Sequence, residues 1–169
     1  MATDTQELLE RARSLATRSA LEDSVARVEF EQALDRLRRL AGKPPRYTEG
    51  VRFENAVAAI LFRLPDASVA LSPRAPGTTH HPDFWVRKGD EVILVDAKSG
   101  RPGSRPTFKQ TVRELERALP AFDAIRGIVV VPDKSYSPVA TIETSPRVSL
   151  VQLSQLESYL QEPPRGAVT

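Results

Sequence analysis

The dipeptide Gly89-Asp90 is the feature that most constrains the possible fold of this chain. It lies between two short apolar runs and is typical of a two-residue turn between antiparallel strands. If these two residues form the loop, Lys88 opposes Glu91. Counting outward along both strands then brings Asp83 directly opposite Asp96. Directly opposed side chains have Cβ atoms about 5 Å apart, and like charges at such positions are destabilising. Two carboxylates placed in this way indicate a role other than core packing.

The second strand of this pair adds a third charged group. Alternation places Asp96 and Lys98 on one face and Ala97 on the other. Two carboxylates and an ammonium group suit a divalent cation beside a water molecule, because hard cations such as Mg²⁺ take oxygen ligands. The alternative is an exposed ion pair on an edge strand, with Asp83 as a turn residue. The run EVILV argues against that alternative, because an apolar character on both faces is typical of a central strand.

A further carboxylate lies on a helix predicted over residues 48–64. Glu54 shares a face with Val57, Ala58 and Leu61, at spacings of three, four and seven. A glutamate on an inward face is costly unless it is paired or coordinated. Glu54 is therefore a candidate third oxygen ligand, or a base acting through water. The alternative is a boundary position that reaches solvent.

The rest of the chain predicts an α/β fold with a mixed central sheet flanked by helices. Residues 5–41 read as two helices or one kinked helix, with an apolar stripe formed by Leu21, Val25, Val28, Leu34, Leu37 and Leu40 or Ala41. After the helix at 48–64 we expect strands at 68–71 and on both sides of the turn, a helix that ends at Pro120, strands at IRGIVVVP and VSLVQL, and a helix at SQLESYLQ. This order divides the chain into an N-terminal helical extension (1–45), a main domain (46–162) and a tail (163–169).

Composition narrows the class of protein and of partner. The chain has no cysteine, which excludes disulfides and thiolate zinc sites. It has no apolar run near the ~20 residues of a membrane span and no signal-peptide pattern, so we expect a cytoplasmic protein without membrane contact. The formal net charge is only +2, but residues 98–113 hold five basic residues and no acidic one. A local excess of this kind favours a phosphate-bearing partner.

These residues resemble the PD-(D/E)XK nucleases of restriction endonuclease-like fold. The resemblance lies in Pro82-Asp83, in the triplet Asp96-Ala97-Lys98 thirteen residues further on, and in Glu54 on the preceding helix. The expected order of elements from about residue 48 to residue 161 is similar to the core of that fold. The triplet begins with Asp rather than the commoner Glu, which the family pattern allows.

The resemblance implies a metal-dependent nuclease that hydrolyses phosphodiester bonds, of DNA rather than RNA. Asp83, Asp96 and the backbone carbonyl of Ala97 would bind Mg²⁺, for which Mn²⁺ would substitute. Glu54 would complete the metal site, and Lys98 would orient the attacking water and stabilise charge on the phosphate. One alternative is a catalytically silent nucleic-acid-binding subunit of the same fold. Another is a nuclease toxin or defence effector.

Several residues around this motif are candidates for contacts with nucleic acid. Arg101 and Arg105 are expected to grip the backbone, with a solvated loop as the alternative. By the resemblance, Lys109 and Gln110 occupy the region where some members place a polar residue near the phosphate. His80-His81 cannot chelate together on an extended chain, because adjacent residues point in opposite directions. We expect ordinary loop histidines there, and core packing rather than base stacking for Trp85.

The apolar stripe of the first 45 residues must be buried somewhere, because a lone amphipathic helix of this length is marginal in water. It could fold back on its own core. It could instead form a homodimer through the N-terminal helices, which we favour. Double-strand cutting by an enzyme with one site favours two active sites related by a two-fold axis.

Overall fold

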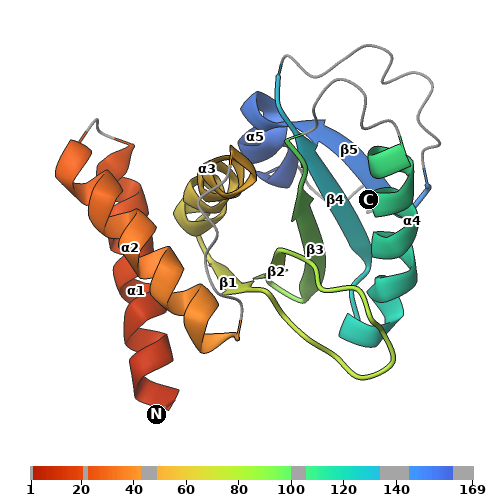
Figure 1. Ribbon diagram of the computed structural model, residues 1–169, viewed down its shortest axis with the longest axis horizontal. Coiled ribbons are helices and arrows are strands. Elements are labelled where there is room, and N and C mark those ends of the chain that lie inside the picture. The colour runs from red at the N-terminus through yellow and green to blue at the C-terminus, as the bar shows by residue number, and fades with distance from the viewer. Residues whose placement is uncertain (1, 21–22, 43–48, 100–105, 134–144, 162–169) are drawn as a thin grey trace.

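The computed structural model describes residues 2–20, 23–42, 49–99, 106–133 and 145–161 (Figure 1). Its elements are α1 (Ala2–Ser19), α2 (Ser24–Leu40), α3 (Glu49–Arg63), β1 (Ala67–Leu71), β2 (Phe84–Lys88), β3 (Glu91–Ala97), α4 (Pro106–Ala118), η1 (Leu119–Phe122), β4 (Arg126–Val131), β5 (Val148–Gln152), η3 (Leu153–Gln155) and α5 (Leu156–Gln161). This confirms the α/β class with a mixed sheet. None of the described helices is both long and apolar enough to cross a lipid bilayer.

The five strands form one sheet in the order β1-β2-β3-β4-β5. The pairs β1–β2 and β2–β3 are antiparallel, whereas the pairs β3–β4 and β4–β5 are parallel. The predicted register of β2 and β3 is confirmed, because Lys88 pairs with Glu91 and Phe84 with Val95. Since β3 lies in the middle of the sheet, the edge-strand alternative for Asp96 and Lys98 is wrong.

The two faces of the sheet are covered by different helices, and Figure 1 shows α3 and α4 on opposite sides of it. Ile93 and Val95 belong to the core that contains α3, whereas Leu94 belongs to the core beneath α4. Trp85 packs at the edge of this second core, as expected for a packing role. Because side chains alternate along a strand, Asp96 lies on the α4 face with Leu94.

A close approach at Gly127 sets the position of α4 over the sheet. A Cβ atom at this residue would lie 2.8 Å from Leu115 Cδ2 and 3.3 Å from Val148 Cγ2. Only glycine leaves room for the helix at this distance. The adjacent residue Glu114 is thereby held above the strand ends, where it takes part in the candidate site.

The N-terminal residues form two helices, and these pack together on the α3 side of the sheet (Figure 1). Phe30 of α2 makes an edge-to-face contact with Phe62 of α3, at 5.9 Å between ring centroids. Arg13 of α1 donates a hydrogen bond to the carbonyl of Ala67 at the start of β1. The buried residues of both helices belong to one core with α3 and the sheet. The N-terminal helices therefore bury their apolar side chains by folding back on the core of their own chain, as the alternative to a dimer predicted.

The prediction of which residues form the buried stripe was partly wrong. Val25, Val28 and Leu40 are exposed, at 63%, 54% and 61%. The buried face of α2 consists instead of Ala26, Phe30, Ala33, Leu34, Leu37 and Arg38. Small residues on this face, together with Ala12 and Ala16 on α1, let the two helices approach closely, which a search for large apolar residues does not detect. Leu21 lies outside the described residues.

We expect a variant that begins at Tyr47 to be insoluble or to melt at a lower temperature than the full chain. Its α3 would expose Phe62, and Glu54 would lose the partner Arg38. Thermal unfolding followed by circular dichroism, and recovery after centrifugation, measure the two effects. A soluble truncated protein with the melting temperature of the full chain would show that the hairpin does not contribute to the core.

Candidate functional site

Asp83 and Asp96 lie together where β2 begins and β3 ends. The backbone N–H of Asp83 donates to Asp96 Oδ1 at 2.9 Å, and the N–H of Ala97 donates to Asp83 Oδ2 at 2.8 Å. Each carboxylate thus accepts a hydrogen bond from the backbone of the opposite segment. The side chain of Asp96 is almost fully buried, at 3% exposure. The two opposed acids predicted from the turn therefore form a fixed pair.

His80 lies next to this pair. Its Nε2 lies 2.7 Å from Asp96 Oδ2, and its Nδ1 lies 3.4 Å from Glu114 Oε2 on α4. The hydrogen bond with Asp96 raises the pKa of His80 above its usual value, and the nearby charges of Glu114 and Asp83 act in the same direction, whereas burial lowers the pKa. A charged imidazole can donate from both ring nitrogens, which fits a position between two carboxylates.

Lys98 follows directly after β3 and continues its pairing with β4. Its backbone N–H donates to the carbonyl of Val130 at 2.9 Å. Continued alternation assigns Lys98 to the same face as Asp96, while Ala97 packs against the core on the α3 side. Continued alternation would thus bring a lysine to the face that carries the two carboxylates, at one end of the sheet.

Glu54 has a strong partner of its own in α2. Arg38, whose side chain is 2% exposed, donates from Nε to Glu54 Oε1 at 3.0 Å and from Nη2 to Asn55 Oδ1 at 2.7 Å. Asp35 lies 3.6 Å from the same guanidinium group. Glu54 is therefore the counter-ion of a buried arginine. It lies on α3, which packs on the face of the sheet opposite to that of Asp96.

We expect Glu54→Gln to lower the free energy of unfolding by about 3 kcal/mol, because it removes the nearest counter-ion of the buried Arg38 and leaves the more distant Asp35 as its acidic partner. Urea unfolding at neutral pH measures this loss. The matched control is the double variant Arg38→Met/Glu54→Gln, which removes both charges and should recover much of the stability. Native stability of Glu54→Gln would contradict a structural role for this glutamate.

Only some of the residues predicted to contact nucleic acid are among those that the structure describes. Arg101 and Arg105 lie outside the described residues, and Lys109 lies in α4 at a position whose side chain is not described. Gln110 is exposed and donates from Nε2 to Glu114 Oε1 at 2.8 Å. Gln110, Glu114, His80 and Asp96 therefore form one continuous chain of polar contacts between α4 and β3.

Two of the predicted metal ligands are carboxylates that the structure brings together. Asp83 and Asp96 fit a hard cation in ligand type, because both offer carboxylate oxygens. Among the residues the structure describes, however, no group of three or more His, Asp or Glu side chains is arranged to hold a metal ion. Asp96 Oδ2 contacts His80 instead. A cation bound at Asp96 would therefore have to share this carboxylate with His80 or displace the imidazole.

Sequence reasoning missed His80 and Glu114 as members of the site. His80 lies in the loop between β1 and β2, where no periodicity indicates the direction of a side chain. Glu114 does carry a signal, because it is four residues after Gln110 on a helix and so lies on the same face. Following the helix face from Gln110 would have found it.

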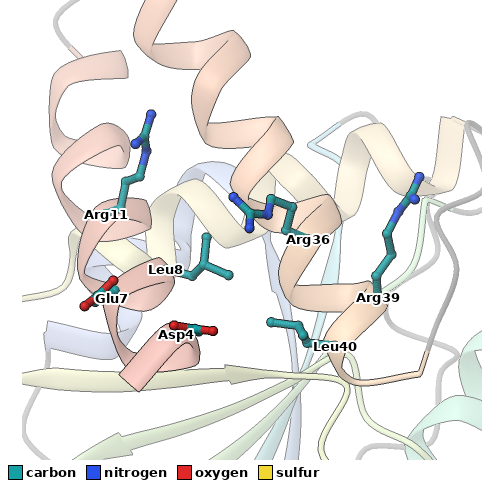
Figure 2. Close-up of a pocket in the computed structure, with 7 residues that line it drawn as sticks. All are labelled: Asp4, Glu7, Leu8, Arg11, Arg36, Arg39 and Leu40. Carbon is teal, nitrogen blue, oxygen red and sulfur yellow. The ribbon is translucent and has the colours of Figure 1, made fainter. Parts of the chain in front are cut away.

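A separate cleft of about 450 Å³ lies between the hairpin helices. Figure 2 shows that Asp4, Glu7 and Leu8 of α1 form one wall and that Arg36 and Leu40 of α2 form the other. No member of the polar chain from Gln110 to Asp96 lines this cleft. It is therefore distinct from the candidate site.

Comparisons with known proteins give little guidance. No protein-family model and no curated protein matches the sequence. One similar chain is in the solved structure titled "Refined half-complex from tetradecameric assembly of Thermococcus gammatolerans McrB AAA+ hexamers with bound McrC", with 18% sequence identity and a TM-score of 0.42. The match covers 86% of this chain and 46% of the other, so this chain spans less than half of that protein's length. A likeness at this level carries no argument about fold or function.

Proposed function

We propose that the protein is a metal-dependent nuclease of restriction endonuclease-like fold that hydrolyses phosphodiester bonds of DNA. The observation that carries the proposal is the carboxylate pair, in which Asp83 and Asp96 are joined through backbone amides at one end of the central strands. Opposed acids are an unfavourable choice for core packing, so their fixed arrangement favours a chemical role.

The order of elements adds support. A helix, three antiparallel strands, a crossover helix and a parallel strand follow one another from α3 to β4. This order agrees with the core expected from the sequence motif, and alternation along the strands would bring Asp83, Asp96 and Lys98 to one face of the sheet. The carboxylate positions and the lysine are those that the resemblance implies.

The proposed roles follow from charge and position. Asp83 and Asp96, with the carbonyl of Ala97, would hold Mg²⁺ or Mn²⁺, and such an ion supplies charge neutralisation and a more acidic water. Lys98 would orient the attacking water and stabilise negative charge on the phosphate. Glu54, held by Arg38, would act on the site by supporting α3, and its role as a ligand would require it to leave this arginine.

We expect Asp83→Ala, Asp96→Ala and Lys98→Ala each to lower Mg²⁺-dependent cleavage by about 100-fold or more, because each removes charge that stabilises the transition state. The measurement is cleavage of plasmid, linear and single-stranded DNA and of RNA, with Mg²⁺, with Mn²⁺ and with EDTA. This substrate panel also tests the preference for DNA over RNA.

Asp90→Ala is the matched control, because Asp90 is an exposed carboxylate at the other end of the same strand pair. It should leave cleavage unchanged. Undiminished cleavage by Asp96→Ala would refute the assignment. Nucleic-acid binding by the native protein without any cleavage would favour the catalytically silent subunit. Cleavage that arrests growth of the cell producing the protein would favour a toxin or defence effector.

A homodimer through the N-terminal helices would set two such sites on one duplex. Its support is now the exposed apolar residues Val25, Val28 and Leu40 of α2, since Leu34 and Leu37 of the stripe are buried within the chain. We expect sedimentation velocity to show a dimer that dissociates in the variant Val28→Glu. A native protein that sediments as a monomer at the concentrations used for cleavage would contradict the homodimer.

A further inference from the structure

A cleft of about 620 Å³ opens beside the carboxylate pair. Its lining includes Ser72 and Arg74 from the loop after β1, His80, and Glu114 and Arg117 from α4. His80 belongs to both places, because it lines the cleft and contacts Asp96. The cleft is therefore separated from the carboxylate pair by a single side chain.

Ser72 is the least expected residue of this lining. It is 6% exposed, and its hydroxyl oxygen has no hydrogen-bond partner within the described structure. Buried hydroxyl groups are normally paired, because an unpaired one loses its bonds to water without replacement. Its backbone also has a φ of 49°, in the left-handed region that serine rarely adopts. Two unfavourable features thus coincide at one residue of the cleft.

The position of Ser72 is fixed by the sheet. Its backbone N–H donates to the carbonyl of Asp83 at 2.9 Å, one step beyond the pairing of Leu71 with Phe84. The hydroxyl is therefore held at a constant place relative to the carboxylate pair. An unpaired buried donor thus belongs to a residue that lines the cleft.

The charge of the cleft favours an anion. Arg74 and Arg117 are exposed, and neither forms an ion pair with another described residue. Glu114 is the one acid in the lining, and its carboxylate is engaged by Gln110 and His80. Two arginines therefore face the cleft with no free acid to neutralise them. Arginine suits phosphate because its planar guanidinium group can donate two parallel hydrogen bonds.

We propose that this cleft binds a phosphate of one nucleic-acid strand, next to the phosphodiester that is cleaved. Arg74 and Arg117 supply the opposing charge, and the Ser72 hydroxyl donates to a phosphate oxygen. The volume suits part of one strand rather than a duplex, since pockets for small ligands span about 300–1,000 Å³. This inference rests on the proposed nuclease function for the position of the cleaved bond.

The test measures binding without cleavage, by fluorescence anisotropy of a short labelled single-stranded oligonucleotide with the full chain in EDTA. We expect Arg74→Gln/Arg117→Gln to weaken binding by roughly tenfold or more and to lower the salt dependence by about 0.7 per phosphate contact. The matched control is Arg18→Gln/Arg27→Gln, which removes one exposed arginine of α1 and one of α2, neither of which lines the cleft. This control should bind like the native protein.

Ser72→Ala separates a binding role from a structural one. Loss of a hydrogen bond to a charged phosphate should weaken binding by about tenfold. The melting temperature should stay the same or rise, because the substitution removes a buried hydroxyl group with no partner. A lower melting temperature with native affinity would overturn the role of Ser72.

The outcomes separate this inference from the nuclease proposal. Native binding by Arg74→Gln/Arg117→Gln overturns the cleft, even if the protein cleaves DNA through Asp96. Loss of binding in that variant supports the cleft, even if the native protein cleaves no substrate with Mg²⁺. Competition by inorganic phosphate as effective as competition by unlabelled oligonucleotide would overturn the strand as ligand, because it would indicate a site for free phosphate.

Discussion

The register between β2 and β3 is the constraint on which the candidate site depends. A slip of one residue would turn every side chain of one strand to the other face, and Asp83 and Asp96 would no longer meet. The register is held by the turn, in which Gly89 has a φ of 62°, and by Phe84 and Val95, which are fully buried opposite each other. The same alternation that buries the apolar residues on the α3 side directs Asp96 to the α4 side.

The opposed acids are tolerated because each has a compensating donor. Two like charges at directly opposed positions repel each other. Against this, a hydrogen bond to a charged group contributes about 1.5–3 kcal/mol, and each carboxylate accepts one from the opposite backbone. Asp96 additionally contacts His80, whose raised pKa favours the charged imidazole. The pair is thus held by local hydrogen bonds from the backbone and from His80.

The sequence predicted the features that depend on local rules. The turn, the register, the two faces of β3 and the crossover helix followed from residue types and their periodicity. The partner of Glu54 did not, because Arg38 lies on another helix and no local pattern connects the two. The buried face of α2 was also misjudged, since close helix packing there uses alanines rather than large apolar residues. His80 lay in a loop, where direction depends on the tertiary structure.

Arg38 and Ser72 are both buried polar residues, but they differ in whether their polar groups have partners. Arg38 is a buried charge whose guanidinium group has Glu54, Asn55 and Asp35 around it, so its burial serves the fold. The hydroxyl of Ser72 is buried without such a partner, and strained backbone of this kind persists only where the surrounding structure holds it. The holding contact is the hydrogen bond to the carbonyl of Asp83, whose side chain is in turn bonded to Ala97. The cleft and the carboxylate pair are therefore connected through Asp83. A strand bound at Ser72 would have its neighbouring phosphodiester placed by the sheet itself, and binding in the cleft would then contribute to orientation at Asp96.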